Sequence, residues 1–260
     1  EDLDDSFFEK TSTVPEGKIF PPGSWTPAAN PTSTALGIPT LTYVESLEKD
    51  GYVSINYPVL TEGILFEGDN QIIYITDPEG KKIEKVTEGT FPEWSKDNSM
   101  FAFIRDGQLF VADIEKQKLV SVIKLPDGEA SFPSFSPDNK RIVFISDGEI
   151  YIAEIESGQI ERLTNDEFRD GQTTWSPAND KIAFSSDRQG NTAIFLVDAN
   201  KQDIQRISPI KYDADTPAWI DNGDSILFIL YQPPTNYGKL YQMTSYGTNL
   251  EIIYSGLKSS

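Results

Sequence analysis

Histidine and cysteine are both absent from this chain of 260 residues. Without them the chain cannot build a Ser-His-Asp or Cys-His nucleophile, and it lacks the ligands that zinc sites normally use. Disulfides are excluded as well. The enzymatic options that remain are mostly carboxylate pairs, tyrosines and lysines. The composition therefore favours a non-catalytic protein, and it requires no cofactor.

Basic residues are scarce, because 22 Lys and Arg stand against 41 Asp and Glu, for a net charge of -19. Such a chain repels nucleic acid and anionic membrane surfaces, which are bound through basic patches. Its longest apolar run, residues 226–231, is far shorter than the roughly 18–20 residues of a membrane span. We therefore expect neither a nucleic-acid partner nor a membrane span. No signal peptide is present, but the chain begins at Glu1, so we expect processing, and export stays open.

One segment recurs along the chain with a period of about forty residues. Its aligned aromatic residues lie 41, 40 and 44 positions apart, and they are Trp94, Phe135, Trp175 and Trp219. A fifth copy precedes them, with Tyr57 in the aromatic position. This period is typical of the four-stranded blades of a β-propeller.

The third copy shows how a repeat predicts four strands. A first strand ends on Phe135, and the turn Ser136–Asn139 carries proline and aspartate at its corners. The apolar strand 141–145 follows, then the hairpin signal Asp147-Gly148 and the alternating strand 150–152. A last strand is expected at 160–164. No segment has a sustained helical period, so we predict an all-β fold, a β-propeller of four-stranded antiparallel blades.

Five blades are readable, and the ring has five blades or, with a divergent N-terminal contribution, six. A sandwich with coincidental spacing is the weaker alternative. The predicted propeller spans 40–256, with repeats near 52–87, 90–125, 131–164, 172–208 and 216–254.

Residues 1–39 are rich in Ser, Thr and Pro, a composition typical of extended chain. Three interpretations remain open: a sixth blade, a tether, or an arm that packs on its own propeller or a neighbouring subunit. Aromatic residues at positions 7, 8, 20 and 25 would anchor such an arm, and residues 40–45 would add one closing strand. An arm of this kind can also add a strand to another subunit, so self-association is one candidate partnership.

The strings SPDNKRIVFISDGEIYI and SPANDKIAFSSDRQGNTAIFLVD, the second with Ser186–Asn191, resemble the repeat of TolB-type propellers. The resemblance covers about residues 52–254. It implies the propeller fold and an exported, periplasmic or extracellular protein of the bacterial envelope. Two departures are a missing α/β domain before the propeller and five readable blades where such propellers usually have six. Function does not follow from the fold alone.

The two ends of a propeller differ in their loops. Short, similar a–b and c–d turns are predicted on one face. The opposite face carries b–c and d–a connections that lengthen in the last two copies, and such loops are where binding sites usually lie. We predict a protein-binding surface there, because arginine and tyrosine are favoured interface anchors. Its candidate contacts are Arg169, Arg188, Tyr212, Tyr231 and Tyr237.

A weaker prediction is a Ca²⁺ site. Asp213 and Asp215, with Asp166 and Asp170 near them in repeat phase, would supply oxygen ligands. The spacing is not that of an EF-hand.

Three functions remain open. The first is a non-catalytic binding or assembly module of the bacterial envelope or exterior. The second is a carbohydrate-active or other carboxylate-based propeller enzyme, although no pair of acids stands out. The third is the regulatory propeller of a prolyl-oligopeptidase-like peptidase, although the nucleophile motif G-x-S-x-G is absent.

Overall fold

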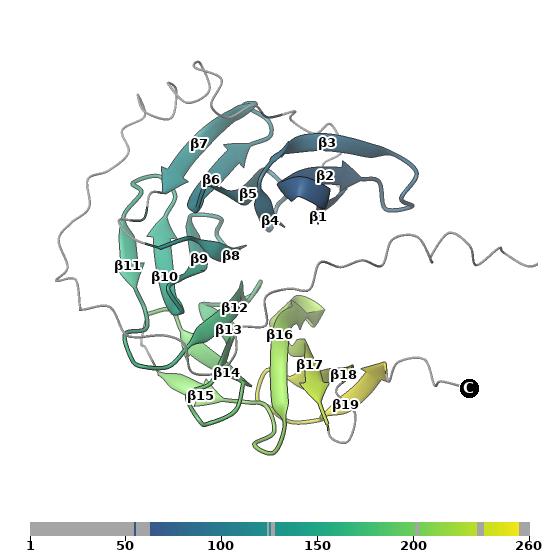
Figure 1. Cartoon of the computed structure of the whole chain (residues 1–260), viewed down its shortest axis with the longest axis vertical. Coiled ribbons are helices and arrows are strands. Elements are labelled where there is room, and N and C mark those ends of the chain that lie inside the picture. The colour runs from purple at the N-terminus through teal and green to yellow at the C-terminus, as the bar shows by residue number, and fades with distance from the viewer. Residues whose placement is uncertain are drawn as a thin grey trace, which may run out of the picture. The chain divides into compact units, whose positions relative to one another are not determined.

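The computed structural model describes Ile55 and residues 63–123, 125, 128–200, 203–232 and 237–254. Within them the chain forms five antiparallel sheets in sequence order, and these are the blades of a β-propeller (Figure 1). The predicted all-β fold and its five blades are confirmed. The predictions for residues 1–39 and for a strand at 40–45 lie outside the described residues.

Each complete blade runs from an inner strand, a, to an outer strand, d. Blade 1 has three described strands, β1 (Ile64–Gly68), β2 (Ile72–Thr76) and β3 (Ile83–Glu88). Blade 2 has β4 (Thr90–Trp94), β5 (Met100–Arg105), β6 (Gln108–Asp113) and β7 (Lys118–Ile123). Blade 3 has β8 (Ser131–Phe135), β9 (Arg141–Ser146), β10 (Glu149–Glu154) and β11 (Ile160–Arg162). Blade 4 has β12 (Asp170–Trp175), β13 (Lys181–Ser186), β14 (Ala193–Asp198) and β15 (Ile204–Arg206). Blade 5 has β16 (Asp213–Ile220), β17 (Ser225–Tyr231), β18 (Gly238–Thr244) and β19 (Glu251–Tyr254).

The first copy of the repeat is described only in part. Its inner strand, predicted to end on Tyr57, lies outside the described residues except for Ile55. That side chain packs against the hydrophobic core that blades 1 and 2 share. The only helical elements in the described part are two short 3-10 turns, η2 (Asp69–Gln71) and η3 (Asp221–Gly223).

All four described inner strands carry the same irregularity. Each has a β-bulge two or three residues before its aromatic end. One bulge residue adopts a left-handed φ of 32–56° in every case, and these residues are Phe91, Phe132, Gln172 and Thr216. A bulge bends a strand and increases its twist, which suits a short strand beside the propeller axis.

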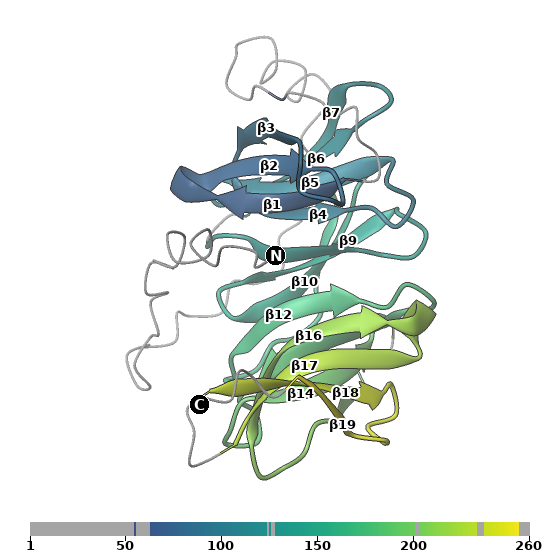
Figure 2. The same ribbon diagram turned by 90° about the vertical axis from the view of Figure 1, so that its right-hand side faces the viewer.

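Successive blades are joined by a repeated main-chain hydrogen bond. The backbone N–H at or just before each inner strand donates to a carbonyl in the b–c connection of the preceding blade. The four donor and acceptor pairs, at 2.7–2.9 Å, are Gly89 to Gln71, Ala130 to Gly107, Asp170 to Gly148 and Ala214 to Thr192. These bonds place the d–a and b–c connections on one face, as predicted, and we call it the loop face. Figure 2 shows the blades side on, with inner strands of successive blades side by side.

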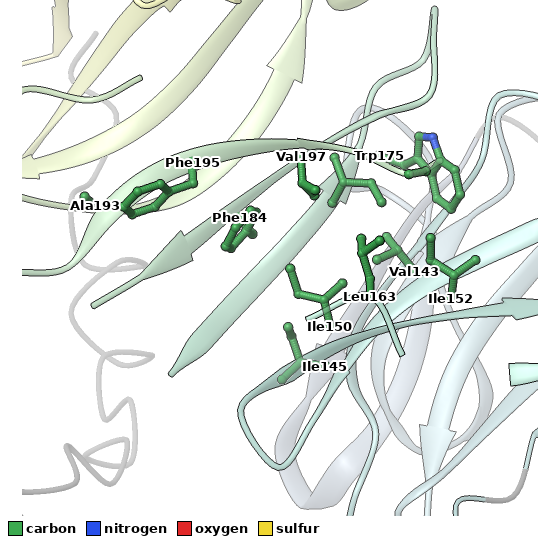
Figure 3. Packing of buried hydrophobic residues seen from close by; sticks show 12 residues of the cluster. Val143, Ile145, Ile150, Ile152, Leu163, Trp175, Phe184, Ala193, Phe195 and Val197 are labelled. Carbon is green, nitrogen blue, oxygen red and sulfur yellow. The ribbon is translucent and has the colours of Figure 1, made fainter. Parts of the chain in front are cut away.

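The hydrophobic core lies between neighbouring blades. Between blades 3 and 4, Ile145 and Ile150 of blade 3 belong to one cluster with Phe184 and Phe195 of blade 4, and Val143 lies nearer Trp175 (Figure 3). Strands b and c of each blade from the second to the fifth also carry a stacked pair of aromatic rings at 5.2–6.1 Å. The pairs are Phe103 with Phe110, Phe144 with Tyr151, Phe184 with Phe195, and Phe228 with Tyr241.

Candidate functional site

Most of the exposed large apolar side chains lie in the last blade and in the loop before it. Eight of the eleven exposed large hydrophobic residues in the described chain lie between positions 210 and 254, in blade 5 and the loop before it. They are Ile210, Tyr231, Tyr237, Tyr246, Leu250, Ile252, Ile253 and Tyr254. Contiguous exposed apolar surface often marks an interaction site.

Three of these side chains flank the loop face, and we call them the blade 5 rim: Ile210, Tyr231 and Tyr237. Ile210 is 79% exposed in the d–a loop that leads into blade 5. Tyr231 ends β17 and is 38% exposed, and Tyr237 precedes β18 and is 82% exposed. Burial and the nearby charge of Asp215 raise the pKa of Tyr231. The rim offers apolar area with polar tips, a combination favoured at protein interfaces.

Tyr212 is half-buried beside the rim. Its ring packs against the core shared by blades 4 and 5. Its carbonyl accepts a hydrogen bond of 2.8 Å from Asn191 Nδ2, and the ammonium of Lys211 lies 5.3 Å from its ring. Tyr212 therefore anchors the d–a loop to the core shared by blades 4 and 5.

Arg188 lies inside the loop cluster of blades 3 and 4, where only 11% of its side chain is exposed. Its guanidinium pairs with Asp170 Oδ1 at 2.8 Å and with Asp166 Oδ2 at 3.4 Å. Its Nε donates to Ser186 Oγ at 3.0 Å, and the guanidinium carbon lies 5.3 Å from the ring of Phe184. Arg188 thus ties the b–c connection of blade 4 to the d–a loop before it, which leaves little of its surface for a partner.

Asp170 supplies the negative charge that allows the Arg188 guanidinium to be mostly buried. The other blades have glycine or alanine at its repeat position, as Gly89, Ala130 and Ala214. Its carboxylate is fully buried, and Oδ2 has no hydrogen-bond partner. Burial raises the pKa of Asp170, and the bond from Arg188 opposes that rise. The pair therefore acts as an internal brace of the loop face.

A second buried carboxylate lies in the same loop cluster. Glu149 begins β10 and pairs with Arg162 at 2.8 Å. Arg162 Nε also donates to the carbonyl of Thr164 at 2.8 Å, so it fixes the start of the d–a loop. Burial raises the pKa of Glu149, and its Oε2 is buried without a partner. Our sequence reasoning missed this pair, although Gln108 and Ala193 at the same repeat position marked Glu149 as unusual.

The d–a loop before blade 4 also has Phe168 and Arg169 among its exposed residues. Arg169 is exposed, and its backbone N–H donates to Asp187 Oδ1 at 2.9 Å. Phe168 beside it is 37% exposed, with Arg188 6.0 Å from its ring. Of the five predicted contacts, Tyr231, Tyr237 and Arg169 are therefore exposed, Tyr212 is half-buried and Arg188 is buried. Their binding roles stay predictions, and sequence reasoning missed Phe168 and Ile210.

The four predicted Ca²⁺ ligands lie in two separate pairs in the structure. Asp166 and Asp170 come together around Arg188, whose guanidinium pairs with both carboxylates. Asp213 and Asp215 lie on β16, and Asp215 Oδ1 accepts from the N–H of Thr216 at 2.7 Å. Among the described residues, no three acidic side chains are arranged to hold a metal ion. Ca²⁺ binding stays a prediction.

The chain matches the family model described as TolB β-propeller domain over residues 66–258. It is similar to a structure described as TolB from Agrobacterium tumefaciens, at 22% identity and a TM-score of 0.62, over 74% of this chain and 76% of that one. TolB from Acinetobacter baumannii is 19% identical at a TM-score of 0.61, over 74% of this chain and 52% of that one. This chain thus spans about half the length of the Acinetobacter protein.

The same fold occurs in an enzyme. Oligogalacturonate lyase from Vibrio parahaemolyticus is 16% identical at a TM-score of 0.54, over 77% of this chain and 68% of that one. At such identities the likeness shows the fold alone. The curated proteins include no match to this chain. None of the described residues belongs to a helix with the length and apolarity that a membrane crossing needs.

Proposed function

Because the chain belongs to the TolB β-propeller domain family, we propose that it is a non-catalytic module that binds another protein in the bacterial envelope or outside the cell. The observation that carries the proposal is the blade 5 rim. Ile210, Tyr231 and Tyr237 expose apolar and aromatic surface on the loop face. Large aromatic side chains on a rigid support are the usual anchors of protein interfaces.

The rigidity of the surrounding loops supports this function. Arg188 and Arg162 each link a b–c connection to a d–a loop through charged hydrogen bonds. Loops held in one conformation lose less conformational entropy when a partner binds. The loop face therefore presents a pre-organised surface.

The buried carboxylates favour binding over carboxylate catalysis. Glu149 and Asp170 have the raised pKa that a general acid needs. Each is buried and paired with an arginine, so neither carboxyl group is presented to a substrate. A propeller enzyme, or the regulatory propeller of a peptidase, is the weaker alternative. The TolB-like repeat favours an exported protein, which fractionation of the producing cells would test.

Photo-crosslinking tests the binding function. The photoreactive residue p-benzoylphenylalanine would replace Tyr237 in the full chain, made in the cells that naturally produce it. We expect one discrete adduct with another protein after irradiation. The matched control places the same residue at Ile83, which is 61% exposed on blade 1. No adduct at 237, or the same adduct from both positions, would overturn the proposal.

A further inference from the structure

The two faces of blade 5 differ in what covers them. One face packs on blade 4, where Phe228, Leu230 and Tyr241 join Ile194 and Leu196 in a shared core. Cross-strand partners in a sheet share a face, and successive residues alternate between faces. The register therefore assigns every other residue of β16, β17 and β18 to the face that points away from blade 4.

That second face, which we call the outer face of blade 5, carries two aspartates on its inner strand and an apolar patch beside them, while Gln242, Thr244 and Glu251 make its other end polar. Asp213 pairs with Tyr231 and Asp215 with Ile229 across β16 and β17. Ile229 pairs with Leu240, and Leu240 with Tyr254. Asp213 is exposed, Tyr231 and Tyr254 are 38% and 55% exposed, and the other three are half-buried.

The two aspartates have no ion-pair partner among the described residues. Burial lowers the pKa of Arg206, and the charge of Asp213 opposes this shift. However, its Nε and NH2 donate to the carbonyls of Ser208 and Pro209, at 3.2 and 2.7 Å. Two carboxylates at spacing i, i+2 therefore present unbalanced negative charge beside apolar surface.

The described outer strand of blade 5, β19, has one charged residue, Glu251, followed by three apolar ones. Proteins commonly protect edge strands with charged side chains and short strands. The edge strands of blades 3 and 4 have three residues each and carry Arg162 and Arg206 opposite the strand c aromatic. In blade 5 the corresponding residue, opposite Tyr241, is Ile252, and all four residues of β19 are exposed.

We propose that the outer face of blade 5 docks an extended segment of another protein, in which lysine or arginine accompanies aliphatic side chains. The cations would face Asp213 and Asp215, and the aliphatic side chains would cover Ile229, Leu240 and Tyr254. This inference rests on the proposed function and names the chemistry of the partner.

Charge decides between this occupant and the alternatives. A second copy of the chain brings its own net charge of -19 to the same face. The chain's own first 54 residues hold more acidic than basic side chains, so they too are repelled. A basic segment is attracted, and in extended form it can also pair with the exposed strand β19.

Selection of 12-residue peptides from a random display library on the full chain tests the inference. We expect selected peptides to combine Lys or Arg with Val, Ile or Leu. The double variant D213N/D215N should weaken their binding about three- to tenfold, the size of two exposed ion pairs. The matched control D69N/D203N, which neutralises two exposed aspartates elsewhere, should leave binding unchanged.

Other outcomes overturn the inference. Peptides that lose affinity with Tyr237→Ala but not with D213N/D215N would keep the proposed function and move the site to the rim. Acidic or uncharged peptides, or no enrichment, would overturn the inference even where position 237 yields its crosslink. A double variant, Val44→Cys with Tyr254→Cys, tests for the two other occupants. The chain has no cysteine of its own, so any disulfide must form between the introduced residues. An intrachain disulfide would identify the chain's own segment, and a disulfide-linked dimer a second copy.

Discussion

Replacing Arg188 by methionine tests the brace of the loop face. Methionine keeps most of the apolar stem against Phe184 but removes the charge. The carboxylate of Asp170 is then fully buried with no cation beside it. Removing one partner of a buried ion pair costs about 3–5 kcal/mol. At about 2–4 °C per kcal/mol, we expect the melting temperature to fall by about 10 °C.

Two further variants separate this mechanism from a simple loss of packing. D170A places in blade 4 the residue that blades 3 and 5 have at that position, so R188M/D170A leaves no buried charge at this position. We expect the double variant to recover at least half of the lost stability. Lys85→Met is the surface control, because Lys85 and its partner Glu88 are 49% and 59% exposed, and it should cost at most about 1 kcal/mol.

The pH dependence gives an independent check of the same variant. Without Arg188, the pKa of Asp170 rises further above that of the unfolded chain. The stabilising effect of its proton is present at low pH and is lost as the pH rises through the folded-state value. R188M should therefore be closest to the wild type at acidic pH. Thermal melts followed by circular dichroism measure both effects, and equal losses for the single and double variants would refute the reasoning.

The two other predictions concern one joint between blades and the buried carboxylate of Glu149. Gly89→Ala should destabilise the chain by about 1–3 kcal/mol in urea titrations, because φ is +152° and the new Cβ would lie 2.7 Å from the Ile104 carbonyl oxygen. An unchanged midpoint would contradict this. Glu149 has a raised folded-state pKa, so its stabilising contribution is lost as the pH rises. The wild type should therefore lose stability relative to Glu149→Gln between acidic and neutral pH, and a constant difference would count against the burial of its charge.

The fold was predictable because the repeat carries its information locally. Each copy contains its own aromatic end, turn and hairpin glycine, so the strand order follows without long-range knowledge. Strand ends differ from the predicted ones where contacts with other parts of the fold determine them. The predicted strand at 160–164 ends at Arg162 as β11, because Thr164 turns its hydroxyl to the N–H of Ile150.

The site was less predictable, because exposure depends on residues that are distant in sequence. Arg188 was predicted as a surface contact, and its burial depends on Asp170, which lies 18 positions earlier. Comparing the copies position by position would have shown an aspartate where the other blades have glycine or alanine. The outer face of blade 5 follows only from the cross-strand register, which no single copy reveals.

The hydrogen bonds that join the blades use main-chain atoms at both ends. A joint of this kind uses no specific side chain, although it excludes proline at the donor position and, at Gly89, a residue with a Cβ. Blades can therefore diverge in sequence, as these five have, while the connection between them stays the same. It also means that a gene duplication with breakpoints in two d–a loops would insert a blade whose joints are already compatible with its neighbours. The main-chain joints alone therefore require no matching substitutions on either side of an inserted blade.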